Sequence, residues 1–216
     1  MNTAAAPPFD AATPSPGAPA RRRAAAQAGM WIFLATEVLF FGGLLLAYGV
    51  GRAHWPQGFA EASRHTHVVL GTLNTALLLT SSALVALAVA CAELAPARRA
   101  AAALLAAAAA LGVAFLAIKG VEYTREWHEG LFPGPGFALA GTEGAALFFM
   151  LYWLVTALHA LHLAIGIAVL AVLAVGTQRR RPWAAPRHVE VAGLYWHFVD
   201  VVWIVLYPLL YLVSRT

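Results

Sequence analysis

Residues 145–175 read AALFFMLYWLVTALHALHLAIGIAVLAVLAV, a run of 31 residues that contains no Asp, Glu, Lys or Arg. A helix of about 20 apolar residues crosses the hydrocarbon core of a bilayer, so this run predicts a transmembrane helix long enough to tilt or to project beyond the membrane. Four further apolar runs lack the alternation of barrel strands: Met30–Val50, Val68–Cys91, Ala100–Ile118 and Val191–Val213. The sequence therefore predicts an all-α membrane protein, a bundle of five transmembrane helices.

The composition of the 216-residue chain agrees with a membrane environment. Hydrophobic residues make up 61% of the chain and charged residues 11%, whereas soluble domains have about 45–50% and about 25%. The sequence pI is about 9.6, but no run of cationic residues exceeds three, so nucleic acid is not an expected partner. The single cysteine, Cys91, excludes an intrachain disulfide and a four-cysteine zinc or iron–sulfur site.

Two segments of different character make up the chain. Residues 1–28 are rich in Ala, Pro and Arg and cannot bury a core, which predicts a disordered cytoplasmic tail. Residues 29–216 hold all five apolar runs and form the predicted membrane domain. The first run is expected to stay as an anchor, because its 21 residues exceed the hydrophobic region of a signal peptide, about 7–15 residues.

The distribution of cationic residues predicts the orientation. If the N-terminus is cytoplasmic, one outer segment is a loop predicted at 119–144. The outer segments together hold five cationic residues: Arg52, Arg64, Lys119, Arg125 and Arg215. The inner segments then hold nine: Arg21, Arg22, Arg23, Arg98, Arg99, Arg179, Arg180, Arg181 and Arg187. Because cytoplasmic segments carry the excess of positive charge, we expect the N-terminus inside and the C-terminus outside.

Glu37 lies seven residues into the first apolar run, where a charged carboxylate is costly. One interpretation is a neutral acid that hydrogen-bonds to a neighbouring helix, since burial favours the uncharged form. The other is a proton relay or a reactive carboxyl that faces lipid. The residue pattern leaves both open, and we expect Glu37 to be protonated at neutral pH and to react with a hydrophobic carbodiimide.

Three histidines lie inside predicted spans. His159 and His162 are three residues apart and share one helix face, and His197 and Asp200 repeat that spacing on the last helix. An aspartate at this distance could orient the imidazole and fix its tautomer. A metal site would require the histidines to converge in space, so interhelical hydrogen bonds or lipid contacts are the expected role and no metal is predicted.

The sequence contains no nucleotide-binding loop, haem-attachment motif or Ser/His/Asp set. No catalytic centre is therefore predicted in the chain by itself. Two classes of function remain: an accessory subunit of a larger membrane complex, and a self-contained transporter or intramembrane enzyme.

Four ordered motifs resemble subunit III of the haem–copper terminal oxidases. The last helix contains YWHFVDVVW at 195–203, with Glu190 five residues before its tyrosine. Upstream, WIFLATEVLFFGG (31–43), LNTALLLTSS (73–82) and TALHALHLAIG (156–166) are similar to family segments in the same order. KGVEYTREW (119–127) matches only in part, because Val121 stands where the family has a tyrosine. The larger family members have seven helices, and this chain resembles the bacterial form that lacks the first two.

The resemblance implies a non-catalytic subunit III of a bacterial terminal oxidase of the cytochrome c oxidase type, in the inner membrane. Its partners would be the catalytic subunit I and subunit II, which would hold the haem and copper of aerobic electron transport. The chain itself would bind phospholipid, sustain proton uptake and stabilise the catalytic subunit. Glu37 matches the carbodiimide-reactive carboxylate of the family. Lipid or interhelical contacts are implied for five other residues: His159, His162, Glu190, His197 and Asp200.

One feature favours a different branch of the same family. The ending from Trp203 to Leu212, with Tyr207-Pro208, and the pair Ser81-Ser82 resemble the subunit III-like proteins associated with nitric oxide reductases of denitrification. The fold and the helper role would be similar. A stand-alone membrane transporter is the second alternative.

Overall fold

The computed structural model describes residues 18–94 and 97–212. Five long helices are apolar enough to cross a membrane. They are α1 (Ala18–His54), α3 (Val68–Ala92), α4 (Arg98–His128), α5 (Ala145–Gln178) and α6 (Pro186–Tyr207), the last continued by a π-helical segment, η2 (Pro208–Leu212). A short helix, α2 (Pro56–Arg64), joins α1 to α3. The described part contains no strand, and the predicted five-helix bundle is confirmed.

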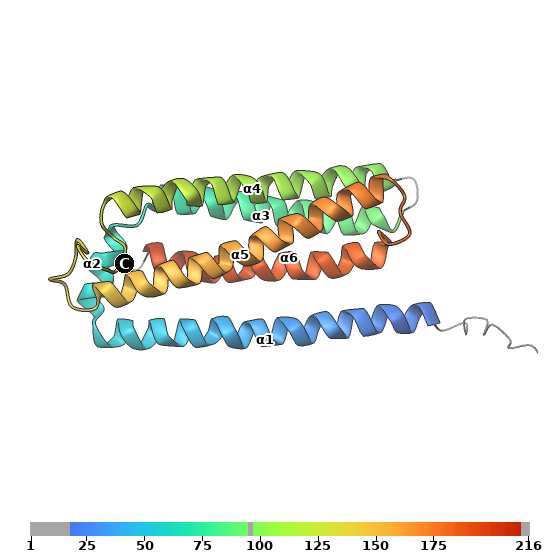
Figure 1. Ribbon diagram of the computed structural model, residues 1–216. Coiled ribbons are helices and arrows are strands. Elements are labelled where there is room, and N and C mark those ends of the chain that lie inside the picture. Colours follow the sequence, from blue (N-terminus) through green and yellow to red (C-terminus); the bar gives the residue numbers. More distant parts are fainter. Residues whose placement is uncertain (1–17, 95–96, 213–216) are drawn as a thin grey trace, which may run out of the picture.

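Four of the long helices form the main body of the bundle. Figure 1 shows α3 and α4 side by side, α6 beneath them and α5 running obliquely across the bundle. The core includes aromatic side chains such as Phe115, Trp196 and Trp203. In this view α1 lies below the other long helices, and it packs against α5 and α6. The described chain begins and ends at opposite ends of the bundle, as an odd number of spans requires.

The N-terminal boundary differs from the expectation. α1 begins at Ala18, so the last part of the segment predicted to be a disordered tail is helical, while residues 1–17 lie outside the described residues. Alanine and arginine are strong helix formers, and the side chains of Arg23 and Gln27 bond to Glu190 on α6. These contacts hold the extended first helix against the bundle.

The sequence places the start of the outer loop, predicted at 119–144, too early in the chain. α4 continues to His128, and the loop starts only at residue 129. Lys119, Glu122 and Glu126 ended the apolar run in the sequence, yet all three are buried inside the bundle. Their positions are three and four residues apart, which places them on one helix face. Lys119 bonds to Glu122, and both Lys119 and Glu126 bond to the hydroxyl of Tyr152.

A proline explains the π-helical ending. Pro208 has no backbone N–H and cannot continue the α-helical hydrogen-bond pattern of α6. Two carbonyl groups of η2 accept hydrogen bonds from other parts of the chain. The Tyr48 hydroxyl of α1 donates to Leu209, and the Thr66 hydroxyl donates to Leu210. The C-terminal segment is thereby tied to the first helix and to the connection after α2.

Two glycines of α4 provide a matched test of helix packing. A Cβ atom at Gly112 would lie 2.8 Å from both Ile167 and Trp196, whereas one at Gly120 would meet nothing within 4 Å. We expect Gly112→Ala to lower the free energy of unfolding by about 1–3 kcal/mol through overpacking. Gly120→Ala should instead leave stability unchanged or raise it by roughly 0.5–1 kcal/mol. Detergent unfolding followed by circular dichroism measures both; equal effects would contradict the packing of α4 on α5 and α6.

Candidate functional site

Glu37 is paired with His162 of α5. The carboxylate Oε2 lies 3.1 Å from His162 Nε2, and the two side chains are 17% and 15% exposed. The ring of Phe41, one turn along α1, packs edge-on against the same imidazole. The first span itself holds no cation beside Glu37, as the sequence indicates, but a neighbouring helix supplies an imidazole.

The contacts of His162 determine how many protons this pair carries. Its Nδ1 atom lies 2.8 Å from the backbone oxygen of Leu158, and a carbonyl oxygen can only accept. Nδ1 therefore carries a hydrogen. The contact between Nε2 and Glu37 then needs one further proton, either on the carboxyl group or on the imidazole. The pair is electrically neutral in both forms and can move this proton between two helices.

The structure separates His159 from His162. His159 is buried and lies between the rings of Phe115 and Trp203. Neither ring nitrogen of His159 has a hydrogen-bond partner among the described residues. The shared face expected from their spacing is split, because His159 points into the core between α4 and α6 and His162 points toward α1.

The last helix does not pair His197 with Asp200, a contact that their spacing left possible. His197 Nδ1 lies 2.6 Å from the Ser82 hydroxyl of α3. Asp200 is buried, and neither of its carboxylate oxygens has a partner in the described part of the chain. Residues three apart on a helix diverge by roughly 60° around the axis. A short aspartate side chain does not bridge that divergence, and a serine on the neighbouring helix takes its place.

Within residues 18–94 and 97–212, no group of three or more His, Cys, Asp or Glu side chains is arranged to hold a metal ion. Glu190 instead makes an interhelical contact. Its Oε2 atom lies 2.6 Å from the Arg23 guanidinium of α1, and Gln27 donates to its Oε1 atom at 2.6 Å. Arg23 also reaches Glu93, at 3.2 Å, at the end of α3. These residues tie together the end of the bundle at which α1 begins.

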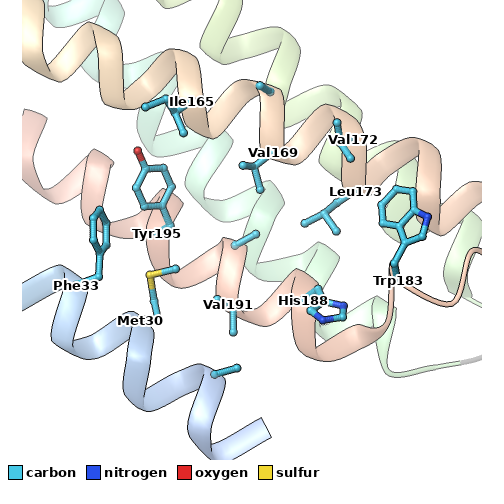
Figure 2. Close-up of a pocket in the computed structure, with 13 residues that line it drawn as sticks. Met30, Phe33, Ile165, Val169, Val172, Leu173, Trp183, His188, Val191 and Tyr195 are labelled. Atoms are coloured by element: carbon cyan, nitrogen blue, oxygen red, sulfur yellow. The ribbon is translucent and has the colours of Figure 1, made fainter. Parts of the chain in front are cut away.

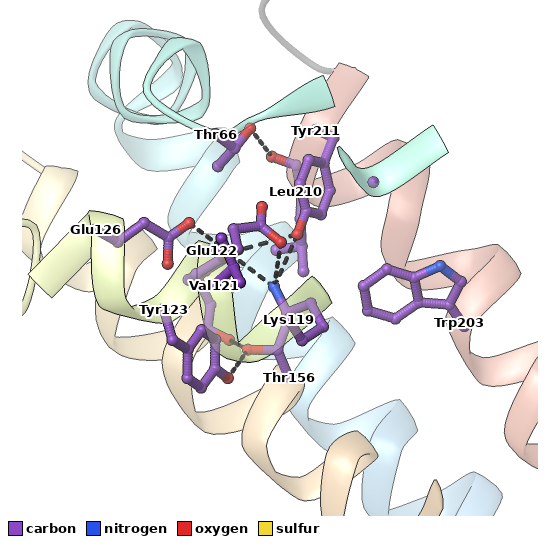
Figure 3. Close-up of polar contacts among 12 residues, drawn as sticks. Thr66, Lys119, Val121, Glu122, Tyr123, Glu126, Thr156, Trp203, Leu210 and Tyr211 are labelled. Atoms are coloured by element: carbon purple, nitrogen blue, oxygen red, sulfur yellow. Dashed lines mark hydrogen bonds and ion pairs between the residues drawn. The ribbon is translucent and has the colours of Figure 1, made fainter. Parts of the chain in front are cut away.

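The opposite end contains a buried cluster that sequence reasoning missed. The ammonium group of Lys119 donates to Glu122 Oε2 and to the hydroxyls of Tyr152 and Tyr211, each at 2.9 Å (Figure 3). Tyr152 in turn donates to Glu126 Oε1 at 2.6 Å. One cation thus connects α4, α5 and η2. We call Lys119, Glu122, Glu126, Tyr152 and Tyr211 the outer cluster, after the side of the membrane on which the sequence predicts this end of the bundle.

The sequence did contain a signal for the outer cluster. Lys119, Glu122 and Glu126 follow the spacing of one helix face, so the helix could have been extended past the apolar run. Val121, where the family motif has a tyrosine, is 48% exposed on the outside of the bundle. The departure from the motif therefore removes no core contact.

Two apolar grooves flank α1. The groove between α1, α5 and α6 has a volume of about 660 Å³ and is lined by residues such as Met30, Phe33, Val169 and Tyr195, with Trp183 and His188 at one end (Figure 2). The second groove, of about 670 Å³, lies on the other side of the α1–α6 contact and includes Trp31, Val38 and His197. Both have the shape and chemistry of sites for acyl chains or apolar helices.

Comparison with known proteins decides the family. The family described as cytochrome c oxidase subunit III matches residues 20–215. The chain belongs to this family. The subunit 3 of cytochrome c oxidase from Thermostichus vulcanus is 32% identical over 194 residues, which is 87% of this chain and 87% of that protein. The corresponding protein of Synechocystis sp. is 33% identical over 85% of this chain and 74% of its own length.

A third relative joins two subunits in one chain. The haem–copper oxidase subunit I+III of Aeropyrum pernix is 31% identical over 87% of this chain, which corresponds to 22% of the larger protein. Membership of the subunit III family and the five apolar helices make this chain a multi-pass membrane protein and an oxidase subunit III that associates with catalytic subunits.

Carbodiimide labelling tests the Glu37–His162 pair. In His162→Phe, Glu37 loses its only described ionisable partner, so the carboxyl group should stay protonated in the apolar run. We expect labelling at neutral pH to increase several-fold over the unchanged protein, and to disappear in Glu37→Gln. Glu190→Gln is the control and should leave labelling unchanged. Labelling that persists in Glu37→Gln would place the reactive carboxyl elsewhere.

Proposed function

We propose that this chain is the non-catalytic subunit III of a bacterial haem–copper terminal oxidase of the cytochrome c oxidase type, in the inner membrane. It packs beside the catalytic subunit, binds phospholipid, and supports proton uptake and the stability of the complex. The haem and copper of oxygen reduction belong to the partner subunits I and II. The observation that carries this proposal is the interhelical contact between Glu37 of α1 and His162 of α5, in a chain of the subunit III family.

The two grooves beside α1 support the lipid-binding part of the proposal. Their walls are almost wholly apolar, and a lipid acyl chain is the common apolar ligand of a membrane. At one end of the first groove, Trp183 and His188 combine an apolar ring with a polar group, the residue chemistry found at membrane–water interfaces. A phospholipid would place its chains along the groove and its headgroup at that end.

The outer face of α1 is the proposed contact with the catalytic partner. Ile32, Leu39 and Leu46 repeat every seven residues and are 68%, 77% and 69% exposed. Nothing within the described chain lies within 4 Å of the Cβ positions of Gly42 and Gly43. Small residues allow transmembrane helices to approach closely. A helix of the partner would fill this space, and the joined subunit I+III relative agrees with such proximity.

The oxygen-reducing branch is favoured over the nitric oxide branch. The relatives described above are named for cytochrome c oxidase or haem–copper oxidase. In the Tyr207-Pro208 ending that suggested the alternative, Pro208 begins the π-helical segment η2. A stand-alone transporter lacks any such support.

Co-purification in a gentle detergent tests the proposed function. The full chain, tagged at one end, should recover a haem-containing catalytic subunit that reduces oxygen. A partner that reduces nitric oxide would select the alternative branch. Recovery of a lone chain that moves a solute in proteoliposomes would contradict both.

A paired substitution locates the contact face. Gly43→Leu adds a bulky side chain to the open face of α1 and should reduce recovery of the catalytic subunit at least about tenfold, equivalent to about 1.4 kcal/mol, without unfolding the chain. Gly120→Leu adds the same side chain to an open position of α4 and serves as the control. Equal loss of the partner in both variants, or no loss in either, would contradict the assignment of the contact to α1.

The proposed orientation places the N-terminus in the cytoplasm. At the end of the bundle where α1 begins, the described arginines include Arg98, Arg99, Arg179 and Arg187, in agreement with the positive-inside rule. Reporter fusions at residue 97 and at residue 140 should therefore report cytoplasm and outside, respectively. The reverse pattern would overturn the orientation.

A further inference from the structure

The outer cluster has an uneven charge count. It contains one ammonium group, that of Lys119, and two carboxyl groups, those of Glu122 and Glu126. Both glutamates are fully buried and Lys119 is 4% exposed. With all three groups ionised, the cluster would carry one uncompensated negative charge in an environment that strongly disfavours buried charge. One proton removes that charge.

The hydrogen bonds distinguish the two carboxyl groups. Glu122 Oε2 receives a hydrogen directly from the Lys119 ammonium, at 2.9 Å. All three ammonium hydrogens are used, because the other two go to the hydroxyls of Tyr152 and Tyr211. Glu126 receives only the hydroxyl hydrogen of Tyr152. The ion pair is therefore between Lys119 and Glu122, and Glu126 has a neutral donor as its partner.

Each carboxyl group also keeps one oxygen free. Glu122 Oε1 and Glu126 Oε2 have no hydrogen-bond partner among the described residues, although both atoms are inaccessible to solvent. A free oxygen on a buried ionised carboxylate is unfavourable. A proton on Glu126 Oε2 converts that group to a neutral acid while Oε1 still accepts the hydrogen bond from Tyr152.

We propose that Lys119, Glu122 and Glu126 form a proton-binding site that holds one proton at neutral pH, with Glu126 as the group that carries it. The site is separate from the Glu37–His162 pair and does not depend on the proposed oxidase partner. Glu126 lies within one turn of the end of α4 at His128. This position gives the proton a short route to the aqueous phase at that end of the bundle.

Other titratable groups lie around the site or at the same end of the bundle. Tyr152 of α5 and Tyr211 of η2 are neutral hydroxyls that accept from Lys119, and Tyr152 also donates to Glu126. Tyr123 of α4 is bonded to Thr156. His67, at the start of α3, lies at the same end of the bundle, with Nε2 unpartnered among the described residues. Glu129, just beyond α4, is exposed to solvent and adds negative charge, which favours a proton on Glu126.

Infrared spectroscopy of the purified full chain tests this proposal. The C=O stretch of a protonated carboxyl group is resolved from that of a carboxylate, and carbon-13 labelling of glutamate separates it from Asp200. At about pH 7, well above the ordinary glutamate pKa of about 4.3, we expect Glu126→Gln to remove one carboxyl equivalent of the protonated band. Glu122→Gln should remove the same amount, since Lys119 then balances Glu126 alone. Lys119→Met should add one equivalent.

Two controls keep the result interpretable. The Glu→Gln changes conserve volume, so they decide the proposal even if Lys119→Met does not fold. Glu143→Gln alters an exposed carboxylate of the loop after α4 and should leave the protonated band unchanged. A band that is unaffected by Glu126→Gln would show that Glu126 is ionised and would overturn the proposal. A band lost in Glu126→Gln but kept in Glu122→Gln would overturn the charge balance on which the site rests.

Discussion

The Lys119 ammonium group, with its three hydrogen bonds, is a buried charge that α4, α5 and η2 must satisfy together. Water is absent from a bilayer core, so a polar group left without a partner there costs several kcal/mol. Glu122, Tyr152 and Tyr211 satisfy the ammonium group completely. They come from α4, α5 and η2. The requirement to satisfy this one charge therefore fixes where the end of α4 lies relative to α5 and to the C-terminal turn.

Besides the contacts of Lys119 at one end of the bundle, polar contacts at its other end and in its middle position the helices. At one end Arg23 joins α1 to Glu190 of α6, and in the middle Glu37 joins α1 to His162 of α5. α1 buries little of its apolar surface within the chain, since the outward side chains of Ile32, Leu39 and Leu46 are mostly exposed. Directional polar contacts thus hold a helix whose remaining surface is free for lipid or for a partner subunit.

Hydrophobic length alone predicts the number of helices, because the bilayer imposes a minimum apolar run on each span. It does not predict where helices end. α4 passes through Lys119, Glu122 and Glu126 because Lys119 pairs with Glu122 on the same helix and the hydroxyls of Tyr152 and Tyr211 complete the hydrogen bonding. These two tyrosines lie far away in the sequence. Of the candidate site residues, His162, His197 and Glu190 have interhelical partners in the structure. The helical spacing of His197 and Asp200, by contrast, does not bring those two side chains into contact. Which contacts form depends on the direction of each side chain and on which side chains of the neighbouring helices lie within hydrogen-bond distance.

The most direct test of this account is a double-mutant cycle on the free energy of unfolding of the full chain, with Lys119→Met, Glu122→Gln and the two combined. Lys119→Met alone should cost about 3–5 kcal/mol, because it leaves buried carboxyl groups without their cation. The combined variant should recover part of that loss, with a coupling energy of at least about 1 kcal/mol. Losses that add within about 0.5 kcal/mol would contradict the central role of the buried ammonium group.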